Sequence, residues 1–244
     1  MTLNYSRFYA SFHPNDPRHF HGLSLLHRRI LGPHLPADRN APILDFGCGR
    51  GYALQTVATL GYTNLQGVDA DAGQAAFACK QGLNVAHTEN SLEFVTARPN
   101  TYAAVLLMDV LEHVPREAQP ALLRAIVQSL RPGGCLICTV PNAASAIASY
   151  WLYNDYTHHT SFTNESLQFV LEESGFSRVT CCDVEFEVRP RFLFWLPTPR
   201  AMQWWLRCVT RCRQRLTLFA ELGWRKSRTI ALTPNILAVA TKAG

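Results

Sequence analysis

The sequence predicts an α/β fold in which helices cover both faces of a mostly parallel sheet. Between residues 41 and 183, strand-like and helix-like segments alternate without a linker-like break. Residues 101–108 read as a fully buried strand, which is typical of a parallel sheet covered on both sides. A glycine-rich loop at 47–51 joins the first strand to a helix. We therefore expect one α/β domain with an N-terminal extension and a C-terminal appendage.

The expected elements alternate along this domain. Short apolar runs that end at polar or turn residues predict the strands, and apolar positions at intervals of about three to four residues predict the helices. In chain order we expect the helix 18–31, strand 43–46, helix 52–60, strand 65–68, helix 72–81, strand 83–87, strand 101–108, helix 121–130 (ended by Arg-Pro-Gly-Gly), strand 135–140, helix 164–174, and the strands 178–188 and 235–242.

The helix 164–174 carries signals for both of its ends. Thr163 suits its N-cap, and Phe162 and Leu167 are spaced to pack together across its first turn. Gly175 suits the residue that follows its end. The long connection at 141–162 precedes this helix, and such connections at the carboxyl ends of strands commonly carry function.

Residues 43–51, Ile-Leu-Asp-Phe-Gly-Cys-Gly-Arg-Gly, carry the most specific chemical pattern in the chain. Glycines in such a loop let the backbone turn sharply and approach a ligand closely. Asp45 stands before the loop, where a carboxylate would attract a cationic ligand and repel a pyrophosphate. Asp69 ends the second strand, at a place suited to a ribose diol.

Asp-x-Gly-x-Gly-x-Gly at 45–51, followed by Gly-Val-Asp at 67–69, resembles class I S-adenosylmethionine-dependent methyltransferases. Asp-Val-Leu-Glu-His-Val-Pro at 109–115 is similar to the motif after the fourth strand in the family's small-molecule and sugar O-methyltransferase branches. Residues 131–142 resemble the family's fifth-strand region, because they consist of Arg-Pro-Gly-Gly followed by a strand that ends in Val-Pro-Asn. The resemblance covers residues 41 to about 183. It implies a Rossmann-like, seven-stranded sheet of order 3-2-1-4-5-7-6 whose last strand is antiparallel.

The resemblance also implies S-adenosyl-L-methionine as the cofactor. It places Asp69 at the ribose and Asp109 at the methionine end or the acceptor. The family's usual Gly-Asp pair after the third strand is absent, so which polar side chain there serves the adenine stays open. The expected cofactor-binding residues are Asp45, Gly47, Cys48, Gly49, Gly51, Asp69, Ala70, Glu89, Asn90, Ser91, Met108 and Asp109.

A hydroxyl acceptor must lose its proton as it attacks a methyl group, and histidine has a pKa suited to that task. Asp155-Tyr-Thr-His158 resembles an Asp-x-Thr-His element found at this place in many O-methyltransferase-like sequences. We predict His158 as the general base and Asp155 as the residue that orients it. His159 is the alternative base and His113 a further candidate. No Asp, Glu and His set has the spacing of a magnesium site, which predicts that no metal is bound.

Residues 189–228 form a strongly basic appendage. They hold ten Lys or Arg against one acid, so this segment has a charge of +9 and the rest of the chain +5 − 9 = −4. Apolar side chains recur at helical spacing within 199–222, at Met202, Trp205, Val209, Cys212, Leu216 and Phe219. Arg207, Arg211 and Arg215 recur on another face.

This pattern predicts a helix that lies in the interface of an anionic membrane. Packing on its own domain or on a second subunit, in a homodimer, is the alternative. Nucleic acid is not expected as a partner, because the aromatic side chains of the segment make it too apolar for a surface that follows phosphates.

The chain therefore divides into three expected parts: an N-terminal helical extension or lid (1–40), a methyltransferase core (41–188 with 229–244) and a basic amphipathic insertion (189–228). The eight cysteines read as small buried hydrophobes, so we expect neither disulfides nor zinc. The absence of a long apolar run and of a secretory signal predicts a cytoplasmic protein, peripheral at the inner membrane face if the insertion binds lipid.

The expected activity is in-line methyl transfer to a sugar hydroxyl of a nucleotide sugar or a lipid-linked glycan. A quinone or small-lipid methyltransferase is the alternative enzyme. A cofactor-binding but inactive partner subunit is the non-enzymatic alternative, and the intact loop with Asp45, Gly47, Gly49 and Asp69 argues against it.

Overall fold

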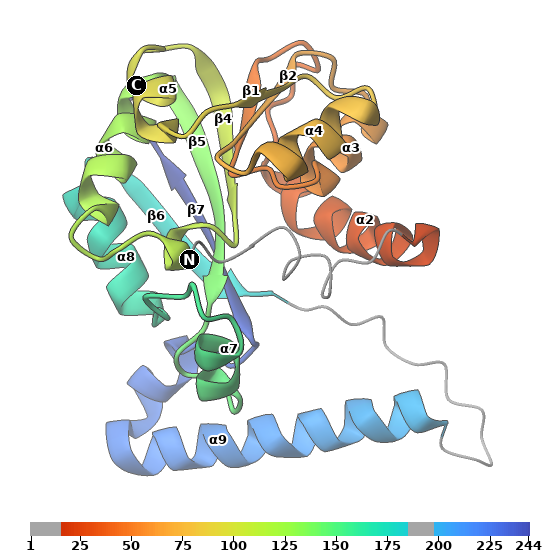
Figure 1. The fold of residues 1–244 in the computed structure, drawn as a ribbon. Helices are drawn as coiled ribbons and strands as arrows, with labels where there is room; N and C mark the ends of the chain where they lie inside the picture. The colour runs from red at the N-terminus through yellow and green to blue at the C-terminus, as the bar shows by residue number, and fades with distance from the viewer. Residues whose placement is uncertain (1–15, 185–197) are drawn as a thin grey trace.

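The computed structural model describes residues 16–184 and 198–244, and its elements follow the predicted alternation (Figure 1). The predicted N-terminal extension before residue 16 and the segment 185–197 lie outside the described residues. The helices are α2 (Pro17–Leu31), α3 (Tyr52–Thr59), α4 (Ala72–Lys80), α5 (Ser91–Thr96), α6 (Gln119–Ser129), α7 (Ala148–Asn154), α8 (Asn164–Glu173) and α9 (Pro199–Thr229), with short 3-10 turns η1 (Gly32–His34) and η2 (Leu111–His113).

Seven strands form one sheet in the order β3-β2-β1-β4-β5-β7-β6, which confirms the predicted topology. Strand β7 is antiparallel to both of its neighbours, and the other pairs are parallel. The strands are β1 (Ile43–Phe46), β2 (Leu65–Asp69), β3 (Val85–His87), β4 (Tyr102–Met108), β5 (Leu130–Pro141), β6 (Arg178–Asp183) and β7 (Asn235–Thr241).

Helices cover both faces of the sheet, with α5, α6 and α8 on one side and α2, α3 and α4 on the other (Figure 1). Side chains of β4 alternate between the two faces, so Leu107 packs under α6 and α8 while Leu106 packs under α2 and α3. Both are fully buried, and each such side chain contributes about 1.5–3 kcal/mol to stability. Cys135 and Cys138 of β5 lie on opposite faces, as predicted, and all eight cysteines are free thiols.

Strand β5 begins earlier than predicted. The residues Arg131 to Gly134 were expected as a turn between helix and strand, but they lie within β5 as an irregularity, because Tyr102 pairs with Leu130 and Ala104 already pairs with Cys135. Helices α5 and α7 and the turn η2 were not predicted. Each is too short to show a helical period.

The boundary signals of α8 are confirmed. The Thr163 hydroxyl accepts a hydrogen bond from the Ser166 amide (3.2 Å), and the Ser166 hydroxyl accepts one from the Thr163 amide (2.9 Å). Phe162 and Leu167 are buried in one core cluster, and Gly175 has a φ of 107° after the end of the helix.

The predicted helix of the basic appendage is present as α9, but it has a break at Gly223 (φ 77°, ψ 170°). The apolar side chains of its stripe are solvent-exposed. On the face with the regularly spaced arginines, Arg207 is exposed, whereas Arg211 and Arg215 are half-buried. Among the described residues, no helix is long and apolar enough to cross a membrane.

Candidate active site

The glycine-rich loop between β1 and α3 is pressed against the end of β2. The amides of Gly47 and Cys48 both donate to the carbonyl oxygen of Val68, at 2.8 and 3.1 Å. Gly47 has a φ of 70°, and a Cβ atom there would lie 2.6 Å from the side chain of Val110. The loop thus needs glycine for its conformation and for its close packing.

Asp69 at the end of β2 holds this loop. Its two carboxylate oxygens accept hydrogen bonds from the amides of Gly49 (2.7 Å) and Asp71 (2.8 Å). A carboxylate offers about four lone-pair sites, so these bonds leave acceptor capacity for the predicted ribose diol. The sequence prediction missed the structural part of this role.

Asp45 lies beneath the loop and is 1% exposed. One of its oxygens, Oδ2, has no hydrogen-bond partner among the described residues. Burial and the nearby charge of Asp69 raise the pKa of Asp45 to about 7. A buried carboxylate of this kind suits a cationic ligand, because the ligand would pair a charge that is otherwise costly to bury. The residues present therefore fit a group that carries a sulfonium and an ammonium.

The three polar residues predicted near the adenine differ in whether their side chains already form hydrogen bonds within the protein. The Asn90 side chain caps α5, since Oδ1 accepts from the Glu93 amide (3.1 Å) and Nδ2 donates to the Glu93 carboxylate (3.0 Å). Ser91 donates to the Thr88 carbonyl oxygen at 3.4 Å. Glu89 is exposed at the end of β3 and is the strongest candidate of the three. Ala70 is exposed after Asp69, and Met108 is half-buried at the end of β4; their contact with the cofactor stays a prediction.

Asp109 follows β4 with a φ of 53°, a left-handed conformation that costs a non-glycine residue roughly 1–2 kcal/mol. Its Oδ1 accepts hydrogen bonds from the Thr139 hydroxyl (3.0 Å) and from Asn235 Nδ2 (2.8 Å). The side chain of Asp109 is therefore held in place by β5 and β7. Strain of this kind is typical of functional sites.

Asp155 is the centre of the predicted catalytic group. Its Oδ1 accepts from the Thr157 amide (2.9 Å) and the Thr157 hydroxyl (2.7 Å), and its Oδ2 lies 3.9 Å from His158 Nε2. The Thr157 oxygen in turn lies 2.8 Å from His113 Nδ1. Asp155 thus holds Thr157, which contacts His113, and it lies beside His158 without a hydrogen bond to it, so its role in orienting His158 stays a prediction.

These contacts set the tautomers of both histidines. His158 Nδ1 lies 2.9 Å from the Trp151 carbonyl oxygen, which can only accept, so Nδ1 carries the proton. The Thr157 hydroxyl donates to Asp155, so its oxygen accepts from His113 Nδ1. Both imidazoles are left with an Nε2 lone pair, and the two rings stand 4.6 Å apart. Burial and the neighbouring His158 lower the pKa of His113 to about 4, so His113 is neutral at pH 7.

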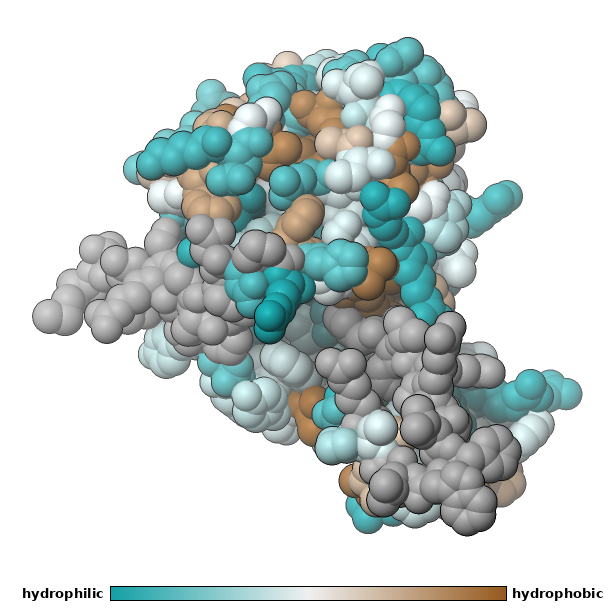
Figure 2. All heavy atoms as spheres, turned by 90° about the vertical axis from the view of Figure 1, so that its right-hand side faces the viewer, coloured by the Kyte–Doolittle hydropathy of each residue, from teal (hydrophilic) through white to brown (hydrophobic). Residues whose placement is uncertain are grey.

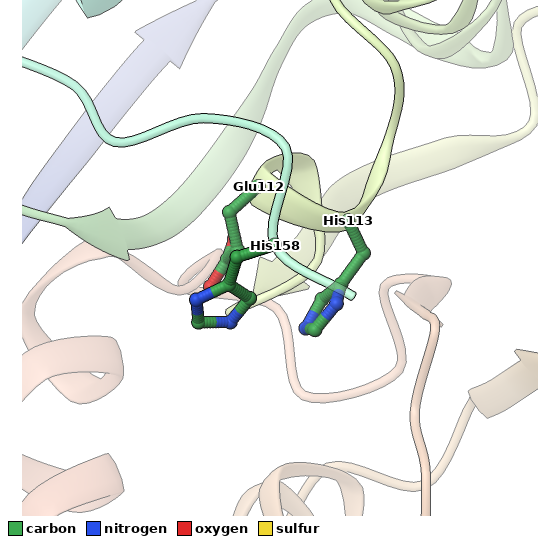
Figure 3. Close-up of side chains that lie close together, drawn as sticks. All are labelled: Glu112, His113 and His158. Carbon is green, nitrogen blue, oxygen red and sulfur yellow. The ribbon is translucent and has the colours of Figure 1, made fainter. Parts of the chain in front are cut away.

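Glu112 joins the two histidines in this group (Figure 3). Glu112, His113 and His158 each offer one ligand atom, and these atoms lie within 4.8 Å of one another, which is close enough to hold a metal ion. Burial and the charge of Asp109 raise the pKa of Glu112 well above its usual range, which favours a protonated acid at this position. The prediction that no metal is bound stays a prediction, since spacing along the chain could not reveal a cluster drawn from two segments.

The structure places Asp155 beside His158, as predicted, and also brings His113 to them through Thr157, which the sequence did not predict. The third histidine, His159, has an exposed side chain, and its amide donates to the Glu112 carbonyl oxygen (2.7 Å), so it anchors the loop through its backbone. Sequence reasoning missed Thr157, Glu112 and the Trp151 carbonyl. The first two stand inside motifs that were recognised, whereas no sequence pattern could indicate a backbone carbonyl.

Comparisons with known proteins identify a family and a fold. A family model described as a methyltransferase domain matches residues 18–180. Proteins named ubiquinone biosynthesis O-methyltransferase from Dinoroseobacter shibae and Paraburkholderia xenovorans are 35% identical over 153 residues and 33% over 105 residues. These matches cover 56% and 41% of this chain, and 60% and 44% of those proteins. The chain thus spans only about half the length of these relatives.

Solved structures share the fold. A SAM-dependent methyltransferase from Archaeoglobus fulgidus superimposes with a TM-score of 0.69 at 22% identity, over 98% of this chain and 100% of that one. Phosphoethanolamine N-methyltransferase 2 from Haemonchus contortus, solved with S-adenosyl-L-methionine, has a TM-score of 0.59 at 14% identity and covers 100% of this chain and 61% of that one. Identities this low show likeness of fold alone.

Proposed function

The chain belongs to the methyltransferase domain family and is an S-adenosyl-L-methionine-dependent methyltransferase, and we propose that it methylates a hydroxyl group with His158 as the general base. The observation that carries this proposal is the arrangement around Asp155. The Asp155 carboxylate holds Thr157 and lies 3.9 Å from His158 Nε2, and the Trp151 carbonyl oxygen holds His158 Nδ1, so the Nε2 lone pair is fixed in direction before any acceptor binds. Preorganisation of this kind lowers the cost of reaching the transition state.

Bound S-adenosyl-L-methionine supplies an electrophilic methyl group on a sulfonium. On the protein side, Asp45 offers a buried carboxylate to the cationic end, and Asp69 offers its remaining acceptor sites to the ribose. His158 Nε2 takes the acceptor proton as the hydroxyl oxygen attacks. Asp155 then faces the imidazolium at 3.9 Å and stabilises its charge.

A phenol or quinol is the favoured acceptor. The ubiquinone O-methyltransferases are the relatives on which this choice rests, and proton energetics supports it. For any one base, taking the proton of a phenol (pKa ~10) costs roughly 8 kcal/mol less than taking that of an aliphatic alcohol, which is close to water at ~16.

A sugar hydroxyl of a nucleotide sugar or lipid-linked glycan is the second candidate. The observation that favours it is a pair of exposed tyrosines, Tyr153 and Tyr156, on either side of Asp155, at 80% and 87% exposure. A tyrosine side chain can pack its apolar ring against a sugar ring and form a hydrogen bond to a sugar hydroxyl through its own hydroxyl.

To test this proposal, the purified protein is incubated with labelled S-adenosyl-L-methionine and one of three acceptors: a catechol, a nucleotide sugar or a primary amine. Mass spectrometry then locates the added methyl group. We expect transfer to the phenolic oxygen, and loss of that transfer in His158→Ala. Transfer to the sugar alone would establish the second candidate, and transfer to the amine alone would refute hydroxyl methylation.

A further inference from the structure

The outward face of α9 is apolar and uncovered. The predicted stripe lies along it, and its members stay solvent-exposed: Met202 (45%), Trp205 (54%), Val209 (45%), Cys212, Leu216 (67%) and Phe219 (46%). In Figure 2, apolar atoms reach the surface at the lower edge of the molecule, where α9 lies. A contiguous row of this kind differs from singly scattered apolar side chains and marks an interaction surface.

Two polar side chains outside the stripe hold α9. Gln214 Nε2 donates to the Ala144 carbonyl oxygen at 3.4 Å. The Arg215 guanidinium donates to the carbonyl oxygens of Ser227 and Ile230, which ties the helix to the chain beyond the break at Gly223. These contacts use no side chain of the stripe, which leaves its apolar side chains exposed.

The charge of α9 complements an anionic surface. Residues 199–229 hold eight Lys or Arg against Glu221, so the net charge is 8 − 1 = +7. Arg213 is exposed beside the stripe, and near its end the Phe219 and Trp224 rings meet at 5.8 Å with Arg228 over Trp224 at 5.2 Å. Aromatic side chains interleaved with cations are typical of helices in the headgroup region of a bilayer.

We infer that α9 docks the protein on a membrane surface that carries anionic lipid headgroups, with its stripe in the interface and its axis along the surface. A second copy of α9 fits less well, because pairing would bring two helices of charge +7 together. A nucleic acid would neutralise the charge but would leave the stripe exposed to water. Docking also brings the connection that carries Asp155 and His158 toward the membrane, since Gln214 of α9 donates to Ala144 in that connection.

Sedimentation with vesicles tests this inference. Phosphatidylcholine vesicles with and without phosphatidylglycerol are mixed with the full chain at low and high salt. We expect sedimentation with the anionic vesicles, little with the neutral ones, and partial release by salt. The double variant Trp205→Glu/Leu216→Glu should weaken vesicle binding roughly tenfold or more for each of the two side chains replaced. A fully buried apolar side chain contributes about 1.5–3 kcal/mol, and 1.4 kcal/mol corresponds to a factor of ten in affinity.

The matched control is Leu25→Glu/Phe169→Glu, which changes equally exposed side chains (52% and 65%) on α2 and α8 and should bind vesicles as the unchanged protein does. Equal binding to neutral vesicles, no binding at all, or full binding by the α9 variant would overturn the inference. So would a dimer, seen by light scattering, that the α9 variant dissociates. Calorimetric binding of S-adenosyl-L-methionine by each variant reports an intact core, and it separates failure of docking from failure of the proposed function.

Discussion

Replacement of Asp155 by asparagine is the sharpest test of how the site is organised. Asparagine has the same shape and its oxygen can still accept from Thr157, but it removes the charge that faces His158. At 3.9 Å, the attraction between the carboxylate and an imidazolium is about 1 kcal/mol in water-like surroundings and about 4 kcal/mol at an effective dielectric constant of ~20. The two side chains are only 16% and 10% exposed, which favours the upper part of that range.

We therefore expect Asp155→Asn to lower kcat by roughly 10²–10³-fold, because each 1.36 kcal/mol is a factor of ten in rate. The affinity for S-adenosyl-L-methionine should not change, since Asp155 lies outside the glycine loop.

Steady-state transfer of labelled methyl groups measures kcat, and calorimetry measures the affinity for S-adenosyl-L-methionine. Asp38→Asn is the matched control, since Asp38 also accepts a hydrogen bond from the amide two residues further on (Asn40, 2.9 Å) but stands outside the site. An Asp155→Asn variant with turnover within about twofold of the unchanged protein would refute the role given to Asp155.

Three further predictions concern the rest of the core. Because Asp45 has a pKa of about 7, it must lose a proton to bind a cation below that pH, so the Kd for S-adenosyl-L-methionine should rise by up to about tenfold per pH unit below 7; calorimetry showing no such dependence would contradict this. Glu112→Gln should keep turnover within about threefold, because glutamine resembles the protonated acid that its raised pKa indicates. If Glu112→Gln instead loses turnover, and the turnover of the unchanged protein requires a divalent cation, Glu112 belongs to a metal site. Asn142→Ala should lower the free energy of unfolding by about 2–4 kcal/mol in urea titrations, since its side chain donates to Ala231 and Thr233 and accepts from Ala144; an effect no larger than that of the exposed Asn84→Ala would contradict it.

Much of the fold could be predicted because periodicity and turn residues act locally. The strands β1, β2 and β4, the caps of α8 and the helix α2 all follow from patterns of fewer than about fifteen residues. The order of the strands came from the resemblance of the glycine loop and its partner motifs, and the structure confirms it. Helix α7 escaped prediction because it is about two turns long and lies in a connection with no apolar period.

The site could be predicted only in part, for a physical reason. His158 and Asp155 stand in one short motif, so their proximity is local. The link from Asp155 through Thr157 to His113 joins residues 44 apart, and only the sheet brings them together. The stripe of α9 shows the same limit, because a period reveals that one face is apolar but does not reveal whether anything covers it.

The central claim is that His158 Nε2 removes the acceptor proton. Turnover of His158→Ala, measured beside His113→Ala and His159→Ala, tests it most directly, with calorimetric binding of S-adenosyl-L-methionine as the control for folding. We predict that His158→Ala loses roughly 10²-fold or more in turnover while the Kd for the cofactor changes little, as expected when a general base is removed. Full turnover in His158→Ala would contradict the claim: it would assign the base to whichever other histidine variant is inactive, or, if all three are active, leave catalysis to positioning alone.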